Sequence, residues 1–247
     1  MEDRKLTVRA VERALDILMC FTKHNELGLT EIAGMINLHK STVHRLMTTL
    51  EEKGFVIRDA ATEKYHLGMK VWELSTHLSQ NDDPSVMLLP AMERLRDQLG
   101  ETVSLYLRDG KDRIRIQAVQ SNQAIRRVAQ VGARLPLYVG ASSKVLVAFA
   151  PLGEQQDLLN DPEWPDSIDR NGYMRQLKEI TERGYATSLE EREPGAAAVS
   201  VPIVNRSGVV TAALSVSGPV SRLSMNTLHE FAPVLIEAAR EMGLMIP

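Results

Sequence analysis

The most constraining feature of this sequence is the amphipathic segment at residues 40–53. Val43, Leu46, Met47 and Leu50 recur at the i, i+3, i+4, i+7 spacing, so they form one apolar face of a helix. The opposite face carries short polar or cationic side chains, namely Lys40, Ser41, His44, Arg45 and Thr48. Such a helix packs one side onto other helices and leaves a hydrogen-bonding side exposed.

The sequence before this segment predicts two further helices. Apolar residues recur at helical spacing over residues 9–24 and again, in a shorter stretch, over residues 30–36. Thr30 is a suitable N-cap for the second helix. Asn37 follows it, and asparagine tolerates the left-handed conformation that a tight turn between helices requires.

After Gly54, residues 55–58 and 64–67 predict two short strands that form a hairpin. The order of helix, short helix, tight turn, helix and hairpin is that of a winged helix-turn-helix. In that fold hydroxyls and cations at the start of the third helix meet phosphates and base edges in the major groove. The residues predicted to contact DNA are Arg9, Thr30, His39, Lys40, Ser41, Thr42, His44, Arg45, Thr48, Arg58 and Lys64. The alternatives are an ordinary three-helix core with a solvated face and a winged helix used for protein contact.

The charge distribution permits this interpretation. The net charge is −3, but residues 1–80 hold 11 Lys and Arg residues and 11 Asp and Glu residues, so the deficit lies in residues 81–247. The first part can therefore carry a basic face, whereas the second repels phosphate. His39 and His44 are not predicted to bind metal, because a spacing of five places them roughly 140° apart on a helix.

Other features of the sequence predict a cytoplasmic location. No apolar run approaches the roughly 18 residues that span a bilayer. Residues 1–5 are not followed by the apolar region of a secretory signal. Cys20 is the single cysteine, so no internal disulfide is expected.

A domain boundary is predicted near residue 84. Residues 68–78 predict one more helix, and the polar stretch 79–84 that follows ends in proline. The predicted domains are a winged helix-turn-helix over residues 1–68, a linker helix over residues 69–83 and a second domain over residues 84–247.

The second domain shows a mixed pattern. Strands are predicted at residues 102–107, 113–119, 125–131, 197–204 and 209–217, with a hairpin turn at Asp109-Gly110, and helices at residues 85–99, 142–149, 154–159, 174–183 and 227–242. Strands, helices, strands again and a closing helix indicate a sheet covered by helices, which is an α+β fold.

Two features of this domain suit a ligand. Residues 137–143 pass from a strand into a helix through small residues, and free amides at a helix start attract a carboxylate. Ser215 and Ser217 share one strand face with Thr211 and Ala213, which leaves space above the sheet. The alternative is close packing of small residues plus a solvated strand edge.

Several runs of this sequence resemble the IclR family of bacterial transcriptional regulators. They are residues 11–18 (VERALDIL), 29–33 (LTEIA), 38–46 (LHKSTVHRL), 50–55 (LEEKGF), 65–68 (YHLG), 132–137 (GARLPL), 141–144 (ASSK), 200–203 (SVPI) and 213–219 (ALSVSGP). The resemblance covers nearly the whole chain. It implies a winged helix-turn-helix joined by a linker helix to a GAF-like effector-binding domain, and a repressor of a catabolic operon that responds to small organic or aromatic acids.

The resemblance also implies a set of effector-binding residues. It assigns helix-terminal amides to Gly140 and Ala141 and hydroxyls to Ser215 and Ser217. The full predicted set is Gly140, Ala141, Ser142, Ser188, Ala198, Ser215 and Ser217. Ser188 and Ala198, on the wall, depart from the pattern, since some members carry an acidic residue and a cysteine there. Glu190 and Glu191 are candidates for the missing carboxylate, and a solvated loop is the alternative interpretation.

The predicted partners are palindromic double-stranded operator DNA, a small carboxylate effector and further copies of the chain. A homodimer or a dimer of dimers is expected, with residues 9–24 and the linker helix as contacts. No cofactor, metal, membrane contact or catalytic residue is predicted. A serine hydrolase is a remote alternative, because the second half has one histidine, His229, and no Gly-x-Ser-x-Gly motif. The other alternative is a DNA-binding protein whose second domain serves only oligomerisation.

Overall fold

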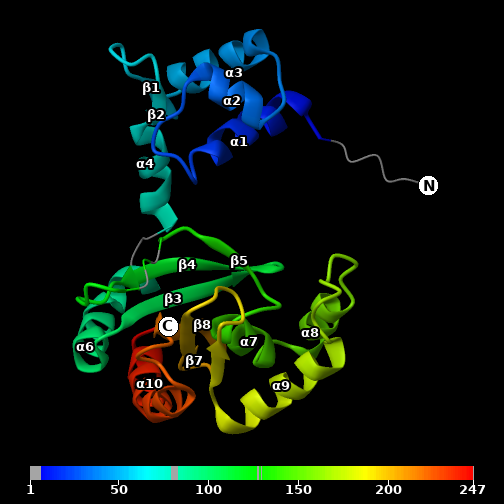
Figure 1. Ribbon diagram of the computed structural model, residues 1–247. Coiled ribbons are helices and arrows are strands. Elements are labelled where there is room, and N and C mark those ends of the chain that lie inside the picture. The colour runs from blue at the N-terminus through cyan, green and yellow to red at the C-terminus, as the bar shows by residue number, and fades with distance from the viewer. Residues whose placement is uncertain (1–6, 79–82, 127, 129, 247) are drawn as a thin grey trace. The chain divides into compact units, whose positions relative to one another are not determined.

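The computed structural model describes residues 7–78, 83–126, 128 and 130–246. The chain divides into two compact units, Met1–Asn81 and Asp82–Pro247. The first unit contains helices α1 (Arg9–Cys20), α2 (Leu29–Met35) and α3 (Lys40–Glu52), strands β1 (Val56–Arg58) and β2 (Tyr65–Leu67), and helix α4 (Met69–Leu78) (Figure 1). The predicted order of helix, short helix, helix and hairpin is confirmed.

The core of the first unit lies between the three helices and the hairpin. Ile17, Ile32, Val43 and Met47 are fully buried there. Asn37 has a φ of 51°, so the left-handed turn predicted between α2 and α3 is confirmed. The first helix ends at Cys20 rather than near residue 24, because the chain turns to bury Phe21 in this core.

A close backbone contact joins the hairpin to α4. The amide of Gly68 donates to Phe55 O at 2.8 Å. A Cβ on Gly68 would lie only 2.2 Å from Gly54 O, so a glycine is required where these two segments meet.

The second unit is built on one antiparallel sheet with the strand order β5-β4-β3-β8-β7-β6. The strands are β3 (Thr102–Asp109), β4 (Asp112–Val119), β5 (Arg134–Pro136), β6 (Ala186–Leu189), β7 (Ala196–Val204) and β8 (Val210–Pro219). The helices are α5 (Pro84–Met87), α6 (Leu89–Leu99), α7 (Ala141–Ala148), α8 (Leu152–Leu159), α9 (Arg170–Arg183) and α10 (Met225–Met245). The predicted α+β architecture is confirmed.

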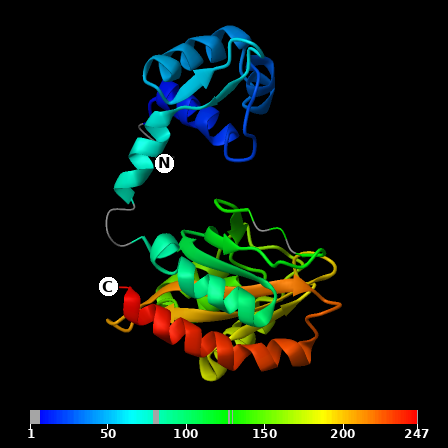
Figure 2. The same ribbon diagram turned by 90° about the vertical axis from the view of Figure 1, so that its left-hand side faces the viewer.

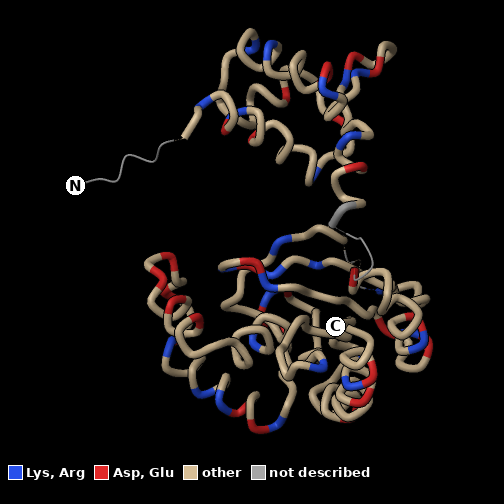
Figure 3. Tube along the Cα trace, turned by 180° about the vertical axis from the view of Figure 1, so that it is seen from behind, with Lys and Arg blue, Asp and Glu red and all other residues tan. Residues whose placement is uncertain are grey.

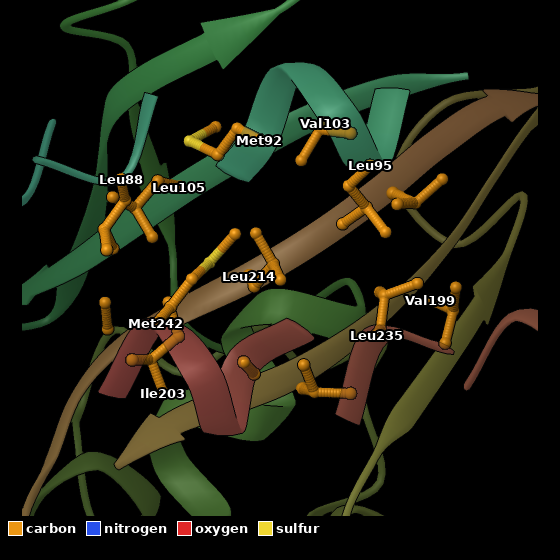
Figure 4. Close-up of a cluster of buried hydrophobic side chains, with 14 of the residues drawn as sticks. Leu88, Met92, Leu95, Val103, Leu105, Val199, Ile203, Leu214, Leu235 and Met242 are labelled. Atoms are coloured by element: carbon orange, nitrogen blue, oxygen red, sulfur yellow. The ribbon is translucent and has the colours of Figure 1, made fainter. Parts of the chain in front are cut away.

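The two faces of the sheet carry different cores. Helices α6 and α10 lie next to each other on one face, as Figure 2 shows. Side chains from α6, the sheet and α10 gather there in one cluster, which includes Met92, Leu214 and Met242 (Figure 4). Helices α7, α8 and α9 cover the other face, where Tyr106 and Ala213 point. Strand alternation therefore sends Ser215 and Ser217 toward the α7 side.

The structure corrects three expectations about the second unit. The strand expected at residues 125–131 is absent from its described residues, while residues 127 and 129 lie outside them. Ile125 and Val128 are 74% and 71% exposed, so pairing there would bury no apolar surface, and β5 begins only after Gly132. The helix expected at residues 85–99 is divided at Leu88, because Pro90 lacks the N–H that would continue it. Strand β6 was not expected.

Candidate functional site

Helix α3 presents the polar face that its spacing predicted. Val43, Met47 and Leu50 are buried, whereas the side chains on the other face are exposed. The exposed set consists of Lys40, Ser41, His44, Arg45 and Thr48, with Thr42 half-buried at its edge. His39 is the exposed N-cap residue, and its side chain does not cap the helix. The first amides of α3 therefore have no side-chain acceptor from His39, and a phosphate can bind there.

Three arginines surround one depression between α1 and α3. The depression has a volume of about 380 Å³, and Arg9, Arg13 and Arg45 line it together with Thr42 and Thr49. Within residues 7–78 none of these arginines forms an ion pair. Arg13 was missing from the residues expected to contact DNA. Its helical position beside Arg9 was visible in the sequence, but its approach to Arg45 depends on how α1 packs on α3.

The wing cations are neutralised by neighbouring carboxylates. Arg58 pairs with Glu63 inside the hairpin, and Lys64 pairs with Glu26 at 2.5 Å. The hydrogen bond that Lys64 donates to the Glu26 carboxylate raises the pKa of Lys64. Figure 3 shows acidic positions next to basic ones at this hairpin. Thr30 is exposed in the first turn of α2.

In the second unit all seven residues predicted to bind an effector line one cavity. These are Gly140, Ala141, Ser142, Ser188, Ala198, Ser215 and Ser217. The cavity is small, about 50 Å³. The sheet register explains the convergence, because Ser217 pairs with Ala198 and Ala198 pairs with Ser188 across three adjacent strands. A row of small side chains on neighbouring strands leaves room above the sheet.

The wall of the cavity contains buried positive charge that the sequence analysis did not identify. Arg113 of β4 is only 3% exposed, and its Nη1 donates to Pro136 O at 2.7 Å and to Val139 O at 3.0 Å. Its guanidinium lies 5.3 Å from the ring centre of Tyr106, which also lines the cavity. Arg115 donates to the Tyr106 hydroxyl at 2.6 and 3.0 Å. The guanidinium of Arg113 at the cavity wall, with that of Arg115 bonded to the Tyr106 hydroxyl, favours an anion in the cavity.

A carboxylate of the chain itself reaches the start of α7. Gly140, the N-cap residue, has a φ of 92°, and its amide donates to Glu191 Oε2 at 3.2 Å. Lys144, one turn into the helix, donates to the other oxygen of Glu191 at 2.5 Å and to Thr187 O at 3.0 Å. The amide assigned to an effector carboxylate is therefore already bonded to a carboxylate.

The remaining wall comes from a loop, while α9 supports the start of α7. Arg192 and Glu193, which pair at 2.5 Å, line the cavity from the segment between β6 and β7. Behind the start of α7, the hydroxyl of Tyr173 donates to Leu137 O at 2.7 Å. Burial raises the pKa of Tyr173, so its hydroxyl remains a donor.

Among residues 7–78, 83–126, 128 and 130–246, no three His, Cys, Asp or Glu side chains gather as metal ligands, and His39 and His44 form no such group. No helix in the same described ranges is both long enough and apolar enough to cross a bilayer.

Comparison with protein families finds two matches on this chain. Residues 10–60 match the IclR helix-turn-helix domain, and residues 81–244 match the bacterial transcriptional regulator IclR C-terminal domain. Among curated proteins, the HTH-type transcriptional regulator KdgR of Escherichia coli is 32% identical over 242 residues, which cover 96% of this chain and 92% of KdgR.

Solved structures agree with these matches. The IclR protein of Thermotoga maritima has a TM-score of 0.73 and 30% identity, covering 96% of this chain and 99% of that one. An IclR homologue from Microbacterium hydrocarbonoxydans, solved in complex with 4-hydroxybenzoate, has a TM-score of 0.82 and 26% identity, covering 95% and 97% of the two chains.

Proposed function

This chain belongs to the IclR family of bacterial transcriptional regulators, and we propose that it binds operator DNA through α3 and a small organic acid in the cavity below α7. The observation that carries the ligand-responsive part is the convergence of the seven predicted residues on one cavity. The matched relatives are transcriptional regulators, so the chain is a DNA-binding regulator rather than a serine hydrolase.

The DNA-contacting surface that we propose centres on Ser41, Arg45 and Thr48 of α3. These side chains are exposed opposite the buried face of the helix, where they can reach base edges and phosphates. Lys40, His44, Thr42, His39, Thr30 and Arg9 extend this surface, and Arg58 and Lys64 form its wing part. Because both wing cations already have carboxylate partners, we assign them the smaller share of the binding.

The effector that we propose is an organic acid, and the charge around the cavity supports this class. Arg113 and Arg115 are buried cations, and the amide of Gly140 lies at the start of a helix. The 4-hydroxybenzoate bound to the Microbacterium homologue is an aromatic acid, which agrees with an acid here. We propose that Gly140, Ala141 and Ser142 hold the acid group and that the serines of the sheet contact the rest.

We further propose a dimer that contacts itself through α1 and α4. Val11, Leu15 and Met19 form an exposed apolar stripe on α1, each between 55% and 56% exposed. Met69 and Trp72 are exposed on α4. Two-fold symmetry would present two copies of α3 to the halves of a palindromic operator. The effector would then favour one spacing of the paired helices, with a coupling of about 1–3 kcal/mol.

The proposal assigns residues 1–68 to DNA binding, residues 69–83 to the linker and residues 84–247 to effector binding. It also places the protein in the cytoplasm, where its operator is. We propose that the protein represses a catabolic operon and that binding of the effector relieves this repression.

The DNA-binding part is tested by selecting sites from a pool of random duplexes with the purified protein. We expect a palindromic site, and we expect Arg45→Ala to weaken binding to it by about 1–3 kcal/mol if Arg45 reads a base. Lys53→Ala is the matched control, because Lys53 follows the last turn of α3 and is not among the predicted contacts. Equal binding by wild type and Arg45→Ala would exclude this docking.

The effector part is tested by thermal shift against keto acids, sugar acids and aromatic acids, 4-hydroxybenzoate among them. A ligand at 100 times its Kd stabilises the native state by about 2.7 kcal/mol. Ser217→Leu should abolish a hit by filling the cavity while sparing DNA affinity. Ser207→Leu is the control, because it makes the same change in the exposed β7–β8 turn. A hit that survives Ser217→Leu would place the ligand elsewhere, and a flat panel would favour the oligomerisation-only alternative.

A further inference from the structure

We infer that the carboxylate of Glu191 holds the β6–β7 loop, one wall of the cavity, against the start of α7. We infer further that an effector binds by displacing this carboxylate from Lys144 and the Gly140 amide. The inference rests on the proposed role of the cavity as the effector site. It assigns Lys144, which the sequence analysis did not consider as a binding residue, and it gives a specific role to Glu191, which was one of two candidates for the missing carboxylate.

The loop between β6 and β7 follows a path that brings Glu191 to the start of α7. Glu190 has a φ of 55°, and its carboxylate accepts from the amide of Gly195 at 2.7 Å, so the loop is closed on itself. Glu191, next in the chain, extends from this closed loop to α7. Arg192 and Glu193 follow and line the cavity. The wall is therefore held to α7 by Glu191, and its far end is held at Gly195, whose carbonyl accepts from the Val220 amide at 2.9 Å.

The cavity has room for only a few waters. Its volume is about 50 Å³, in a measure where a single water needs roughly 10–15 Å³. An aromatic acid such as 4-hydroxybenzoate, with about ten non-hydrogen atoms, is larger than that. The wall must therefore move before such a ligand enters, and the sheet and α7 belong to packed cores that cannot give way as easily. The loop at residues 190–195 is the part of the wall that can open.

The two partners of the Lys144–Glu191 ion pair differ in exposure. The side chain of Lys144 is 6% exposed, whereas that of Glu191 is 33% exposed. Glu191 can leave toward water, but Lys144 stays buried and needs an anion at all times, because an unpaired buried ammonium is strongly unfavourable. A departing Glu191 must therefore be replaced by another negative group.

The charge at Lys144 must stay balanced while one carboxylate replaces another. A ligand carboxylate that joined Glu191 at the same ammonium would place two negative groups side by side, and like charges disfavour each other. Exchange of one carboxylate for another keeps one negative charge at Lys144. A neutral ligand of the same shape cannot make this exchange. The effector is therefore an anionic carboxylate. A neutral analogue binds more weakly, because it cannot replace Glu191 as the partner of Lys144.

A consequence is that Glu191 lowers the apparent affinity for the effector. A ligand that binds only the open loop has its apparent affinity reduced by the fraction of molecules that are open. Removal of Glu191 should therefore tighten the binding of a small carboxylate, even though the same change destabilises the folded protein.

The test uses Glu191→Ala with acetate as the probe, since acetate matches the CH₂–carboxylate fragment that the substitution removes. We expect the variant to melt several degrees below wild type, and acetate to recover most of that loss while shifting wild type much less. Acetamide, or sodium chloride at equal ionic strength, should not recover the melting temperature of the variant. Glu191→Ala combined with Lys144→Met should lose the acetate response. Glu191→Gln serves as a second, isosteric variant if Glu191→Ala does not fold.

Hydrogen exchange distinguishes displacement from a purely structural ion pair. In the full-length wild-type protein, saturating acetate should accelerate exchange of the amides of residues 190–195, and chloride should not. Slower or unchanged exchange in that loop, or an equal acetate shift in wild type and Glu191→Ala, would overturn the inference. Binding of the selected duplex by wild type is measured separately. If wild type binds the selected duplex but acetate has no effect, Glu191 does not hold the loop in the way inferred here, and the proposed function stands.

Discussion

The arginines of the α1–α3 depression and the cations of the wing should respond differently to salt. Arg9, Arg13 and Arg45 have no ion-pair partner within residues 7–78, whereas Arg58 pairs with Glu63 and Lys64 with Glu26. An unpaired cation releases counterions from DNA when it meets a phosphate. A cation that must first leave a carboxylate partner gains less, because the freed carboxylate remains nearby and repels the phosphate.

The magnitude follows from counterion release. Each phosphate neutralised contributes about −0.9 to the slope of log K against log salt. Arg9→Ala and Arg13→Ala should each reduce the slope by about 0.9, which is roughly a threefold to fourfold change in affinity ratio between 50 and 200 mM salt. Arg58→Ala should change the slope by much less. Arg45→Ala should lower affinity for the selected duplex by about 1–3 kcal/mol while sparing a scrambled duplex, if it reads a base.

The assay is fluorescence anisotropy of a labelled duplex, titrated with each variant at several salt concentrations. Glu63→Gln is the matched variant for the wing, because it frees Arg58 without changing the hairpin length and should steepen the slope. The reasoning is refuted if Arg58→Ala reduces the slope as much as Arg9→Ala does, or if Arg9→Ala and Arg13→Ala leave it unchanged.

Three further predictions concern packing and assembly. Tyr173→Phe should lower the free energy of unfolding by about 1–3 kcal/mol in urea titrations, because Leu137 O loses its buried donor, and an unchanged midpoint would contradict this role. Leu15→Lys should shift sedimentation toward monomer while Leu152→Lys, at a still more exposed leucine of α8, should not; identical profiles would remove α1 from the interface. Burial raises the pKa of the Cys20 thiol, so less thiolate exists at any given pH, and Ellman's reagent should label it slowly at pH 8 until urea is added; rapid labelling without urea would show that the core opens.

Local periodicity was sufficient to predict the first unit. The i, i+3, i+4, i+7 stripe of α3 and the turn at Asn37 depend on neighbouring residues only, and both appear in the structure. The same holds for Ser215 and Ser217, because alternation along one strand decides which face they share. Such local patterns do not specify the register between two strands. The row formed by Ser217, Ala198 and Ser188 was placed by family resemblance, and only the sheet pairing explains it.

The unpredicted parts depend on contacts between distant segments. The β-branched residues Ile125, Val128 and Val131 suggested a strand, but no layer covers Ile125 or Val128, so a strand there would bury no apolar side chain. The position of Arg113 in the alternating pattern of β4 is typical of a solvent-facing residue. Arg113 is nevertheless buried, because the start of α7 covers it. A buried cation and an exposed cation look alike in a sequence. The charge of the cavity wall therefore could not be inferred before the sheet and α7 were placed together.

The position of the carboxylate at this cavity follows from the same geometry. Ser188 lies within strand β6, so an acidic residue there would project a fixed negative charge beside Arg113. In this chain the negative charge comes from Glu191, three residues later and on a loop, and it is bonded to Lys144 and Gly140 instead. A charge on a strand cannot withdraw, whereas a charge on a loop can. The serine at position 188 and the carboxylate at position 191 therefore leave the cavity positive once the loop opens, which favours an acid over a neutral or cationic ligand.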